Sequence, residues 1–429
     1  MTGAGGADLD VREPQGFMAP YAEVFAIPRA WRFSVAGIIG RMPMSMYGLG
    51  TVLLISAGTG RYGVAGSVAA AGSLGGAVCA PQLGRLTDRL GQHRVLIPVC
   101  LIFALAVTGL VAAVTLHAPD WTLFLCGITG GATMPQTGPM ARARWSMLLS
   151  GTPRLHTAFS LESVADELCF VVGPAAVTIL ATQVHPAAGL TCAGLLAVVG
   201  SLWFASQRTT EPPAVAVVRQ SAAERAVPGV RRPRLAAPGL IVLMPVYLFL
   251  GAMFVAIDLS TVDFATRLGH KPLAGVLLGC YALGSATGGL WYGSRTWHSL
   301  DSKRLAVTLT LTVAGVCTFW AMPNLLVLAP VIYLCGLTIA PTLIAGYSVL
   351  EATALPGRVT ESMAWLSTGI AVGLACGSTA SGFILDAFGP RWGYAFAGVA
   401  GVIATLIYLG GLRLVAGSER RAAAGASGS

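Results

Sequence analysis

Four charged residues inside apolar segments are the first candidates for chemistry. Arg41 lies in one such segment. Glu162, Asp166 and Glu167 lie together in another. Charged side chains are costly to place in a bilayer, and where they occur they commonly pair with one another or mark a transport pathway. One arginine among three acids leaves an acid without a cation, and such an acid could exchange a proton.

The spacing of these residues places two of them at a similar depth in a membrane. Arg41 lies about eight residues, or ~12 Å, past the start of its predicted helix, and Asp166 lies a similar distance into its own. Glu162 and Asp166 are four residues apart and therefore share one helix face. Glu167 points ~100° away from Asp166 and is free to face a different neighbour.

Twelve apolar runs bounded by charged residues, proline or glycine position these side chains. A bilayer core of ~30 Å needs about 20 helical residues to cross it. The predicted helices span 33–57, 62–83, 95–115, 121–141, 159–183, 186–206, 238–261, 273–294, 304–322, 324–347, 361–385 and 391–415. The predicted fold class is therefore an all-α polytopic membrane protein. Its two six-helix bundles, at 33–206 and 238–415, flank a polar linker at 207–237 that contains six arginines.

The distribution of Lys and Arg predicts the orientation of these helices. With a cytoplasmic N-terminus, 22 of the 27 cations lie in cytoplasmic segments and four lie in outer loops. Cytoplasmic loops carry the excess of positive charge in membrane proteins. We therefore expect a multi-pass protein of the plasma (inner) membrane with both termini inside. Segment 1–32 and the linker are then cytoplasmic, and the tail 416–429 has little that could pack and is expected to be disordered.

Composition excludes several other classes of protein. Only 10% of the residues are charged, against about 25% in soluble globular proteins. The basic residues form no clustered face, so nucleic acid is not an expected partner. The nine cysteines form no CxxC pair and no metal-ligand spacing, and no GxxxxGK[ST] loop is present. We therefore expect no enzyme, no metal, no cofactor and no direct use of ATP.

The charged turn at 84–94, GRLTDRLGQHR, carries the most specific motif of the chain. It resembles the loop between helices 2 and 3 of the major facilitator superfamily of transporters, which typically reads G-x-L-A-D-R-x-G-x-R-R. The matching residues are Gly84, Leu86, Asp88, Arg89, Gly91 and Arg94. Short matches between the two halves, such as AGSLGGAV at 71–78 with LGSATGGL at 283–290, indicate the six-plus-six duplication of many secondary transporters.

The resemblance implies that this loop is part of a gate. In the superfamily it holds the cytoplasmic side closed in the outward-facing state. The gating residues implied here are Gly84, Asp88, Arg89, Gly91 and Arg94. We expect Asp88 to lie near the N-terminus of the eleventh helix, where a carboxylate is stabilised by ~0.3–1 kcal/mol. The simpler alternative is a loop whose cations only set the orientation.

The resemblance also implies a contact between the first and fifth helices, which are neighbours in the superfamily fold. We expect Arg41 to pair there with a carboxylate. The residues assigned to proton coupling or ion pairing are Arg41, Glu162, Asp166 and Glu167. Either Asp166 or Glu167 would exchange the proton. A static network that ties the two helices together is an equally open interpretation.

A substrate cavity is expected between the two halves, where methionine and aromatic side chains form adaptable apolar surfaces. The residues assigned to it are Met44, Tyr47, Tyr247 and Asp258. Arg142 and Arg144, at the end of the fourth helix, are interpreted as anchors at the membrane surface.

The leading hypothesis for function is proton-coupled export of a hydrophobic or amphipathic small molecule by alternating access. Gly173 and Pro174 resemble the G-P dipeptide in helix 5 of proton-antiporting drug exporters, although the flanking glycines of that motif are absent. This favours export, and a packing glycine with a helix bend is the equally open alternative. The expected partners are the small-molecule substrate, protons and the lipid bilayer, and the protein is expected to be a monomer. The alternative is a proton-linked uptake permease for a small organic solute.

Overall fold

The computed structural model describes residues 18–152, 154–214, 238–297, 299–355 and 358–426. These residues form helices and connections without a strand, so the predicted all-α fold class is confirmed. The helices are α1 Ala19–Ala26, α2 Ala30–Arg41, α3 Pro43–Thr59, α4 Tyr62–Leu90, α5 Gln92–Thr115, α6 Asp120–Ala132, α7 Thr137–Leu149, α8 Arg154–Ile179, α9 Ala188–Ser206, α11 Pro238–Arg267, α12 Lys271–Gly293, α13 Asp301–Val316, α14 Leu325–Gly336, α15 Ile339–Thr353, α16 Val359–Phe388 and α17 Pro390–Ala426. Short turns of π- or 3₁₀-helix occupy Leu180–Val184, Arg208–Thr210 and Phe319–Ala321.

Eleven of the predicted crossings are continuous enough to span a membrane in the described part of the chain. The fourth crossing is divided into α6 and α7, which have 13 residues each. A helix of that length reaches only ~20 Å, so the two pieces must together cross a core of ~30 Å. The interruption at 133–136 includes Pro135, which lacks the N–H that a continuous helix would use.

Proline interrupts two other crossings in a similar way. α2 ends at Arg41 and α3 begins at Pro43. In the second half, α14 ends at Gly336 and α15 begins at Ile339, two residues before Pro341. Irregular backbone at membrane depth belongs beside a cavity or inside protein. These interruptions therefore indicate where an internal cavity should be sought.

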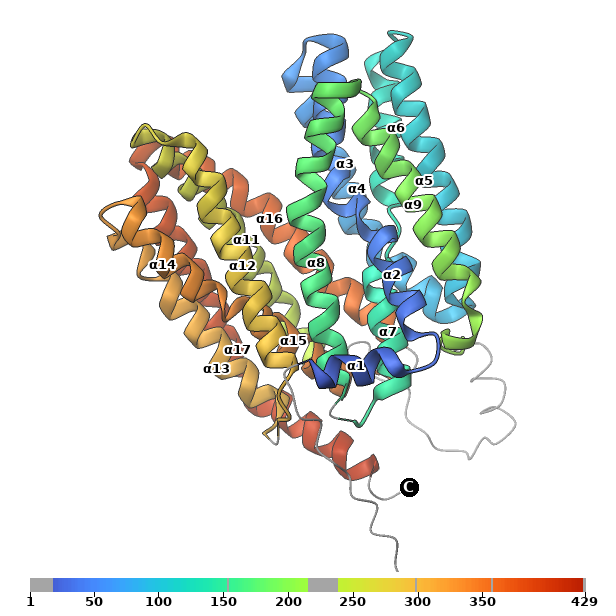
Figure 1. Cartoon of the computed structure of the whole chain (residues 1–429), viewed down its shortest axis with the longest axis vertical. Coiled ribbons are helices and arrows are strands. Elements are labelled where there is room, and N and C mark those ends of the chain that lie inside the picture. The colour runs from blue at the N-terminus through green and yellow to red at the C-terminus, as the bar shows by residue number, and fades with distance from the viewer. Residues whose placement is uncertain (1–17, 153, 215–237, 298, 356–357, 427–429) are drawn as a thin grey trace, which may run out of the picture.

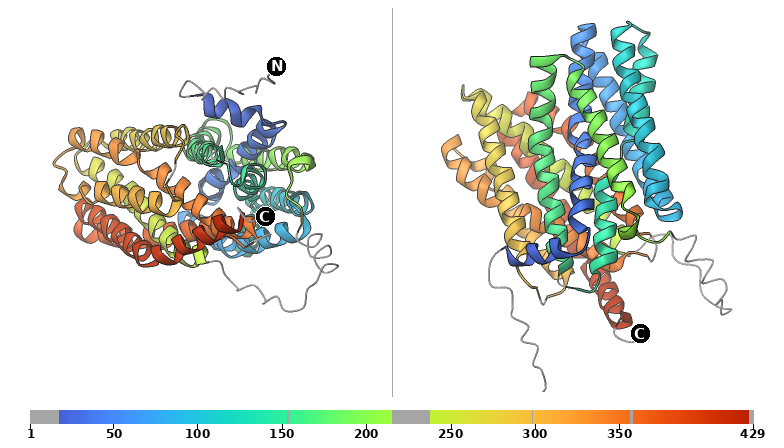
Figure 2. Two further views of the ribbon diagram at one scale, coloured as in Figure 1. Left: turned by 90° about the horizontal axis from the view of Figure 1, so that it is seen from below. Right: turned by 45° about the vertical axis from the view of Figure 1, so that its right-hand side comes forward.

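The helices form two groups that converge at one end of the molecule (Figure 1). Helices α2 to α9 make up one group and α11 to α17 the other, and the two groups lie side by side in the view from below (Figure 2, left). Across the boundary, α4 packs against α16 and α8 packs against α12. We call the end of the molecule that holds residues 84–94 the motif end. The short helix α1 lies across this end (Figure 1).

Glycines allow several of these helices to cross at close range. A Cβ atom on Gly131 of α6 would overlap the carbonyl oxygen of Gly72 in α4. Small residues at such crossings let two backbones approach one another in a membrane. In contrast, a Cβ on Gly66, also in α4, would meet nothing within 4 Å.

Gly131→Ala is expected to destabilise the protein by about 1–3 kcal/mol, the usual penalty for overpacking a close contact. The midpoint of thermal unfolding of the purified protein would measure this effect. Gly66→Ala is the matched control, and it should be neutral or slightly stabilising because alanine favours the helix. Equal unfolding midpoints for the two variants would contradict the close crossing of α4 and α6.

The C-terminal tail corrects one prediction from the sequence. We expected disorder over 416–429, but α17 continues to Ala426, and only 427–429 lie outside the described residues. Glu419 explains the order. Its carboxylate accepts hydrogen bonds from the backbone N–H of Asp301 at 2.7 Å and of Ser302 at 3.3 Å, at the start of α13. A negative charge at a helix N-terminus is favourable.

The segments before and between the two bundles are partly ordered against them. In segment 1–32, the hydroxyl of Tyr21 lies 3.0 Å from Ser160 Oγ in α8 and donates to the carbonyl oxygen of Leu290 in α12 at 2.8 Å. α1 therefore contacts both groups of helices at the motif end. In the linker 207–237, Glu211 pairs with His93 of α5 at 2.8 Å, and residues 215–237 lie outside the described part.

Candidate functional site

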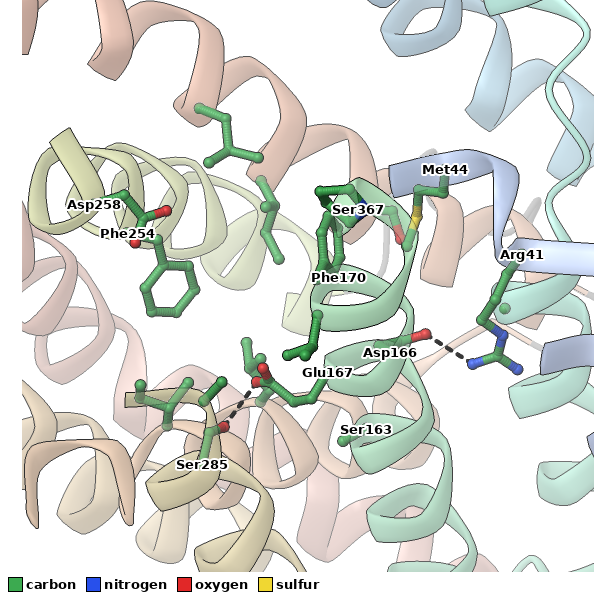
Figure 3. Close-up of a pocket in the computed structure, with 18 of the residues that line it drawn as sticks. Arg41, Met44, Ser163, Asp166, Glu167, Phe170, Phe254, Asp258, Ser285 and Ser367 are labelled. Atoms are coloured by element: carbon green, nitrogen blue, oxygen red, sulfur yellow. Dashed lines mark hydrogen bonds and ion pairs between the residues drawn. The ribbon is translucent and has the colours of Figure 1, made fainter. Parts of the chain in front are cut away.

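A cavity of about 650 Å³ lies between the two groups of helices (Figure 3). Its size falls within the range of small-molecule sites, which is about 300–1,000 Å³. The interrupted backbone at Pro135 and at Ile339 contributes to its wall. The charged and aromatic side chains that line it are Arg41, Arg142, Asp166, Glu167, Phe170, Phe254, Asp258, Tyr281 and Tyr347.

Arg41 forms the ion pairs that the sequence led us to expect with the fifth crossing. Its side chain is 2% exposed, and its guanidinium contacts the carboxylates of both Glu162 and Asp166, the latter at 2.8 Å. Glu162 is completely buried and also accepts a hydrogen bond from Trp145 Nε1 at 2.9 Å. A buried carboxylate with several donors is well satisfied. This arrangement fits a structural role for Glu162.

Arg142 is a site residue whose place the sequence did not reveal. We interpreted it as an anchor at the membrane surface, but it is only 3% exposed. Its Nη2 atom lies 2.6 Å from Asp166 Oδ2, and its guanidinium carbon lies 4.2 Å from the ring centre of Tyr347. The break at Pro135 was a partial signal, because irregular backbone at membrane depth lines a cavity or is buried in protein. Asp166 therefore bridges two arginines.

Arg144 requires the same correction. It is also fully buried, with its guanidinium carbon 3.8 Å from the ring centre of Phe204. It donates to Gln92 Oε1 at 2.7 Å and to the carbonyl oxygen of Gln207 at 2.9 Å. Stacking on an aromatic ring and donating to several acceptors is the behaviour that suits arginine inside a protein. Arg144 therefore fastens the start of the linker to the first group of helices.

Glu167 faces away from the arginine network. Its carboxylate accepts a hydrogen bond from Ser285 Oγ of α12 at 2.7 Å (Figure 3). Among the described residues, it forms no ion pair. Glu167 thus reaches across from one group of helices to the other. Asp258 of α11 also lines the cavity, and in the described part of the chain it has neither a hydrogen bond nor an ion pair.

The four predicted cavity residues divide into two pairs. Met44 and Asp258 line the cavity. Tyr47 is instead buried against Phe103 and donates to the carbonyl oxygen of Gly127 at 2.8 Å. Tyr247 is completely buried and donates to the backbone of α15. The prediction was wrong for both tyrosines because each phenol satisfies its hydroxyl on a neighbouring helix and packs its ring in the core.

The motif at 84–94 lies where α4 meets the start of α16. The carboxylate of Asp88 accepts hydrogen bonds from the backbone N–H of Glu361 at 2.9 Å and of Thr360 at 3.3 Å. These N–H groups are free in the first turn of a helix, where an anion is favourable. A Cβ on Gly84 would lie 3.0 Å from the Cα of Glu361, so glycine permits this contact. Arg85, just after Gly84, pairs with the Glu361 side chain at 3.2 Å.

The remaining motif residues do not join this contact. Arg89 and Arg94 are exposed and form no ion pair among the described residues. Gly91 ends α4 with a φ of 99°, a conformation that favours glycine. The motif therefore divides into a contact at Gly84 and Asp88, a turn at Gly91 and two exposed cations.

Further polar contacts between the two groups lie at the motif end. Thr157 Oγ1 donates to the carbonyl oxygen of Gly293 at 2.6 Å, and Ser160 Oγ donates to that of Gly289 at 2.5 Å. Ser146 Oγ donates to Glu351 at 2.7 Å. Each joins a helix before the linker to a helix after it. Together with the contacts of Asp88, they join the two groups of helices at this end of the molecule.

Asp88→Asn is expected to loosen the motif end, because the neutral amide loses the charge-assisted hydrogen bonds to the start of α16. Such bonds are worth roughly twice a neutral one. We expect faster hydrogen–deuterium exchange of the backbone amides in 359–364, by about tenfold if ~1.4 kcal/mol is lost. Asp120→Asn is a control in an exposed ion pair outside the motif. Exchange in 359–364 that is unchanged by Asp88→Asn would contradict a stabilising contact between Asp88 and the start of α16.

The fold and the cavity define the class of this protein as a helical membrane transporter. The model of the Major Facilitator Superfamily matches residues 33–294 and 243–427. These matches cover most of the chain, which therefore belongs to the Major Facilitator Superfamily. The members of this superfamily are transporters and not enzymes. No curated protein matches the chain.

Solved structures of other transporters share this fold. The human organic anion transporter MFSD10 (TETRAN) is 18% identical, with a TM-score of 0.65 over 89% of this chain and 100% of that one. A bacterial homologue of the iron transporter ferroportin in the outward-facing state is 14% identical, with a TM-score of 0.65 over 89% and 98% of the two chains. FucP in the outward conformation is also 14% identical, with a TM-score of 0.64 over 90% and 99%.

Proposed function

We propose that this protein is a proton-coupled secondary transporter that exports a hydrophobic or amphipathic small molecule by alternating access. The observation that carries the proposal is the environment of Glu167. This carboxylate lines the cavity, forms no ion pair among the described residues and is bound by Ser285 of the other helix group. A titratable group placed in this way can bind and release a proton as the two groups move.

The arginine network supports this assignment by elimination. Arg41 and Arg142 both contact Asp166, and Arg41 also contacts Glu162. Two cations and two anions thus neutralise one another beside the cavity. Removing one partner of a buried ion pair leaves an uncompensated charge. We therefore assign Asp166 a structural role and propose Glu167 as the residue that exchanges the proton.

The hydrogen bond between Glu167 and Ser285 supplies the link to conformation. It joins α8 to α12, and any separation of these helices must break it. A protonated Glu167 carries no charge and can stay in an apolar, closed cavity, whereas an ionised one favours an open, hydrated cavity. Proton binding thus biases the equilibrium between two arrangements of the helix groups, as alternating access requires.

We assign the motif end to the cytoplasm of a plasma-membrane protein. The support is the excess of Lys and Arg that the sequence places in the predicted cytoplasmic segments: without the buried Arg142 and Arg144, 20 cations stand against four in the outer loops. With this orientation, the contacts of Asp88 close the cytoplasmic side, and the conformation described here is the outward-facing one. The ferroportin homologue and FucP, which share this fold, adopt outward-facing conformations in their crystal structures, and this supports the assignment.

Uptake is the alternative direction of transport. A second structure of FucP, that of a single-residue variant of the E. coli fucose:proton symporter, and the proton:xylose symporter XylE have the same fold, at 17% and 12% identity. A carboxylate that exchanges a proton would serve import as well as export. The direction of transport therefore has to be measured.

The deciding experiment is an accumulation assay in cells that lack or overexpress the protein, with a panel of hydrophobic cations, hydrophobic neutral compounds and small polar nutrients. For export, we expect overexpression to lower the accumulation of a hydrophobic or amphipathic compound, and an uncoupler to abolish this effect. Increased accumulation of a nutrient that is sensitive to an uncoupler would overturn export in favour of uptake. Transport unaffected by an uncoupler would overturn proton coupling.

A further inference from the structure

The cavity has an imbalance of charge that bears on what it binds. Its charged lining residues, among those the structure describes, are Arg41, Arg142, Asp166, Glu167 and Asp258. Both arginines are engaged by Asp166, and Arg41 by the buried Glu162 behind it. These four groups balance to zero. The carboxylates of Glu167 and Asp258 remain without a cation.

The two remaining carboxylates come from different groups of helices. Glu167 is carried by α8 and Asp258 by α11, and Figure 3 shows them on separate parts of the cavity wall. Asp258 is exposed to the cavity, and Glu167 is half-buried. A ligand between them would contact both groups of helices at once. Such a position suits a ligand whose binding has to influence how the two groups are arranged.

Aromatic rings accompany each carboxylate. Phe254 precedes Asp258 by four residues on α11, and Phe170 follows Glu167 by three on α8, so each pair shares a helix face. Both rings line the cavity (Figure 3). Aromatic faces attract cations as well as apolar groups. The wall therefore combines negative charge with surfaces that suit a bulky apolar cation.

We propose that the cavity binds an amphipathic organic cation, with Glu167 and Asp258 as its counter-ions and Phe170 and Phe254 as its apolar walls. This inference rests on the proposed transport function and names the substrate class of the same site. An organic anion would meet two unpaired carboxylates and no unpaired arginine, and like charges across a site penalise binding. A neutral compound would leave both carboxylates desolvated without a partner.

The test is equilibrium binding to the purified full-length protein with two probes of matched shape and opposite charge. Tetraphenylphosphonium is the cation, tetraphenylborate is the anion, and the two are measured separately against protein-free detergent or lipid blanks. We expect saturable binding of the cation only. Glu167→Gln and Asp258→Asn should each weaken it by roughly tenfold or more, because an opposite charge is lost from a partly desolvated site.

Matched variants separate a loss of charge from a loss of folding. Glu167→Asp keeps the charge and should retain most of the affinity. Asp263→Asn removes a carboxylate from the end of the same helix as Asp258, where it pairs with Arg267 at 2.8 Å, and should change nothing. The thermal unfolding midpoint of each variant is measured alongside, and only variants with an unchanged midpoint are compared.

The outcomes decide the proposal either way. Saturable binding of tetraphenylphosphonium that depends on both carboxylates supports it. Absence of such binding, comparable binding of tetraphenylborate, or cation affinity unchanged in both Glu167→Gln and Asp258→Asn overturns it. Because equilibrium binding needs neither a proton gradient nor turnover, it can fail while gradient-driven transport of a neutral compound succeeds. Conversely, the protein can bind tetraphenylphosphonium as expected even if its transport proves not to be coupled to protons.

Discussion

Glu167→Gln is expected to abolish transport driven by a pH gradient while leaving substrate exchange at saturating concentration intact. Glutamine keeps the size of the side chain and can still bond Ser285, but it cannot release a proton. The empty carrier then reorients without proton exchange, and a proton gradient no longer drives net flux. Proteoliposomes with an imposed pH gradient measure the first activity, and counterflow without a gradient measures the second. We expect at least a tenfold loss of the first, since a group that carries the coupling ion is removed.

Two variants accompany this prediction. Asp263→Asn removes a half-buried acid near the end of α11, outside the cavity lining, and should leave both activities unchanged. Asp166→Asn weakens the contacts with Arg41 and Arg142. It should lower the thermal stability of the protein, and the protein that remains folded should still couple transport to protons. Full gradient-driven transport by Glu167→Gln would refute the proton role of Glu167. Coupling lost selectively in a stable Asp166→Asn protein would transfer that role to Asp166.

Arg41→Met is expected to have the largest effect on stability. It leaves the completely buried Glu162 and the neighbouring Asp166 without the cation between them. Breaking a buried ion pair by removing one partner costs about 3–5 kcal/mol. We expect low yields of folded protein and a strongly lowered midpoint of thermal unfolding.

An exposed ion pair and a compensating variant make this prediction specific. Arg61 pairs with Asp120 at 2.9 Å, and its side chain is 57% exposed. Arg61→Met should cost only about 0–1 kcal/mol. The double variant Arg41→Met with Glu162→Gln removes one charge of each sign and should recover part of the lost stability. Equal effects of Arg41→Met and Arg61→Met would show that the buried network does not contribute to stability.

Regular patterns made much of the fold predictable. Apolar runs of sufficient length predict helices because the backbone must satisfy its hydrogen bonds internally in a bilayer. The motif at 84–94 led to the superfamily, which the family match confirms. The contact of Asp88 with the start of α16 was also predictable from the sequence, since the backbone N–H groups of a helix N-terminus are favourable partners for an acid. The prediction of a disordered tail was wrong because Glu419 accepts hydrogen bonds from the start of α13, which is far away in the sequence.

The site was predictable only in part. The depth of Arg41 and Asp166 follows from counting residues along two helices, and their contact is present. Arg142 could not be placed in this way. Its position depends on how far α7 turns after the break at Pro135, which the residues of the segment do not specify. Tyr47 and Tyr247 are of a residue type that is common in cavities, but their burial depends on which neighbouring helix offers a carbonyl oxygen.

The sequence by itself determined that this chain crosses the membrane many times, that it belongs to one transporter superfamily and that charge lies at a common depth in two helices. These properties are local or periodic, and they are written in composition, spacing and a contiguous motif. Only the tertiary structure decided which acid stands apart from the arginines. Ion pairing depends on distances between helices that are far apart in the chain. Arg142 completes a neutral network around Asp166, and Glu167 is left to face Ser285 and the cavity.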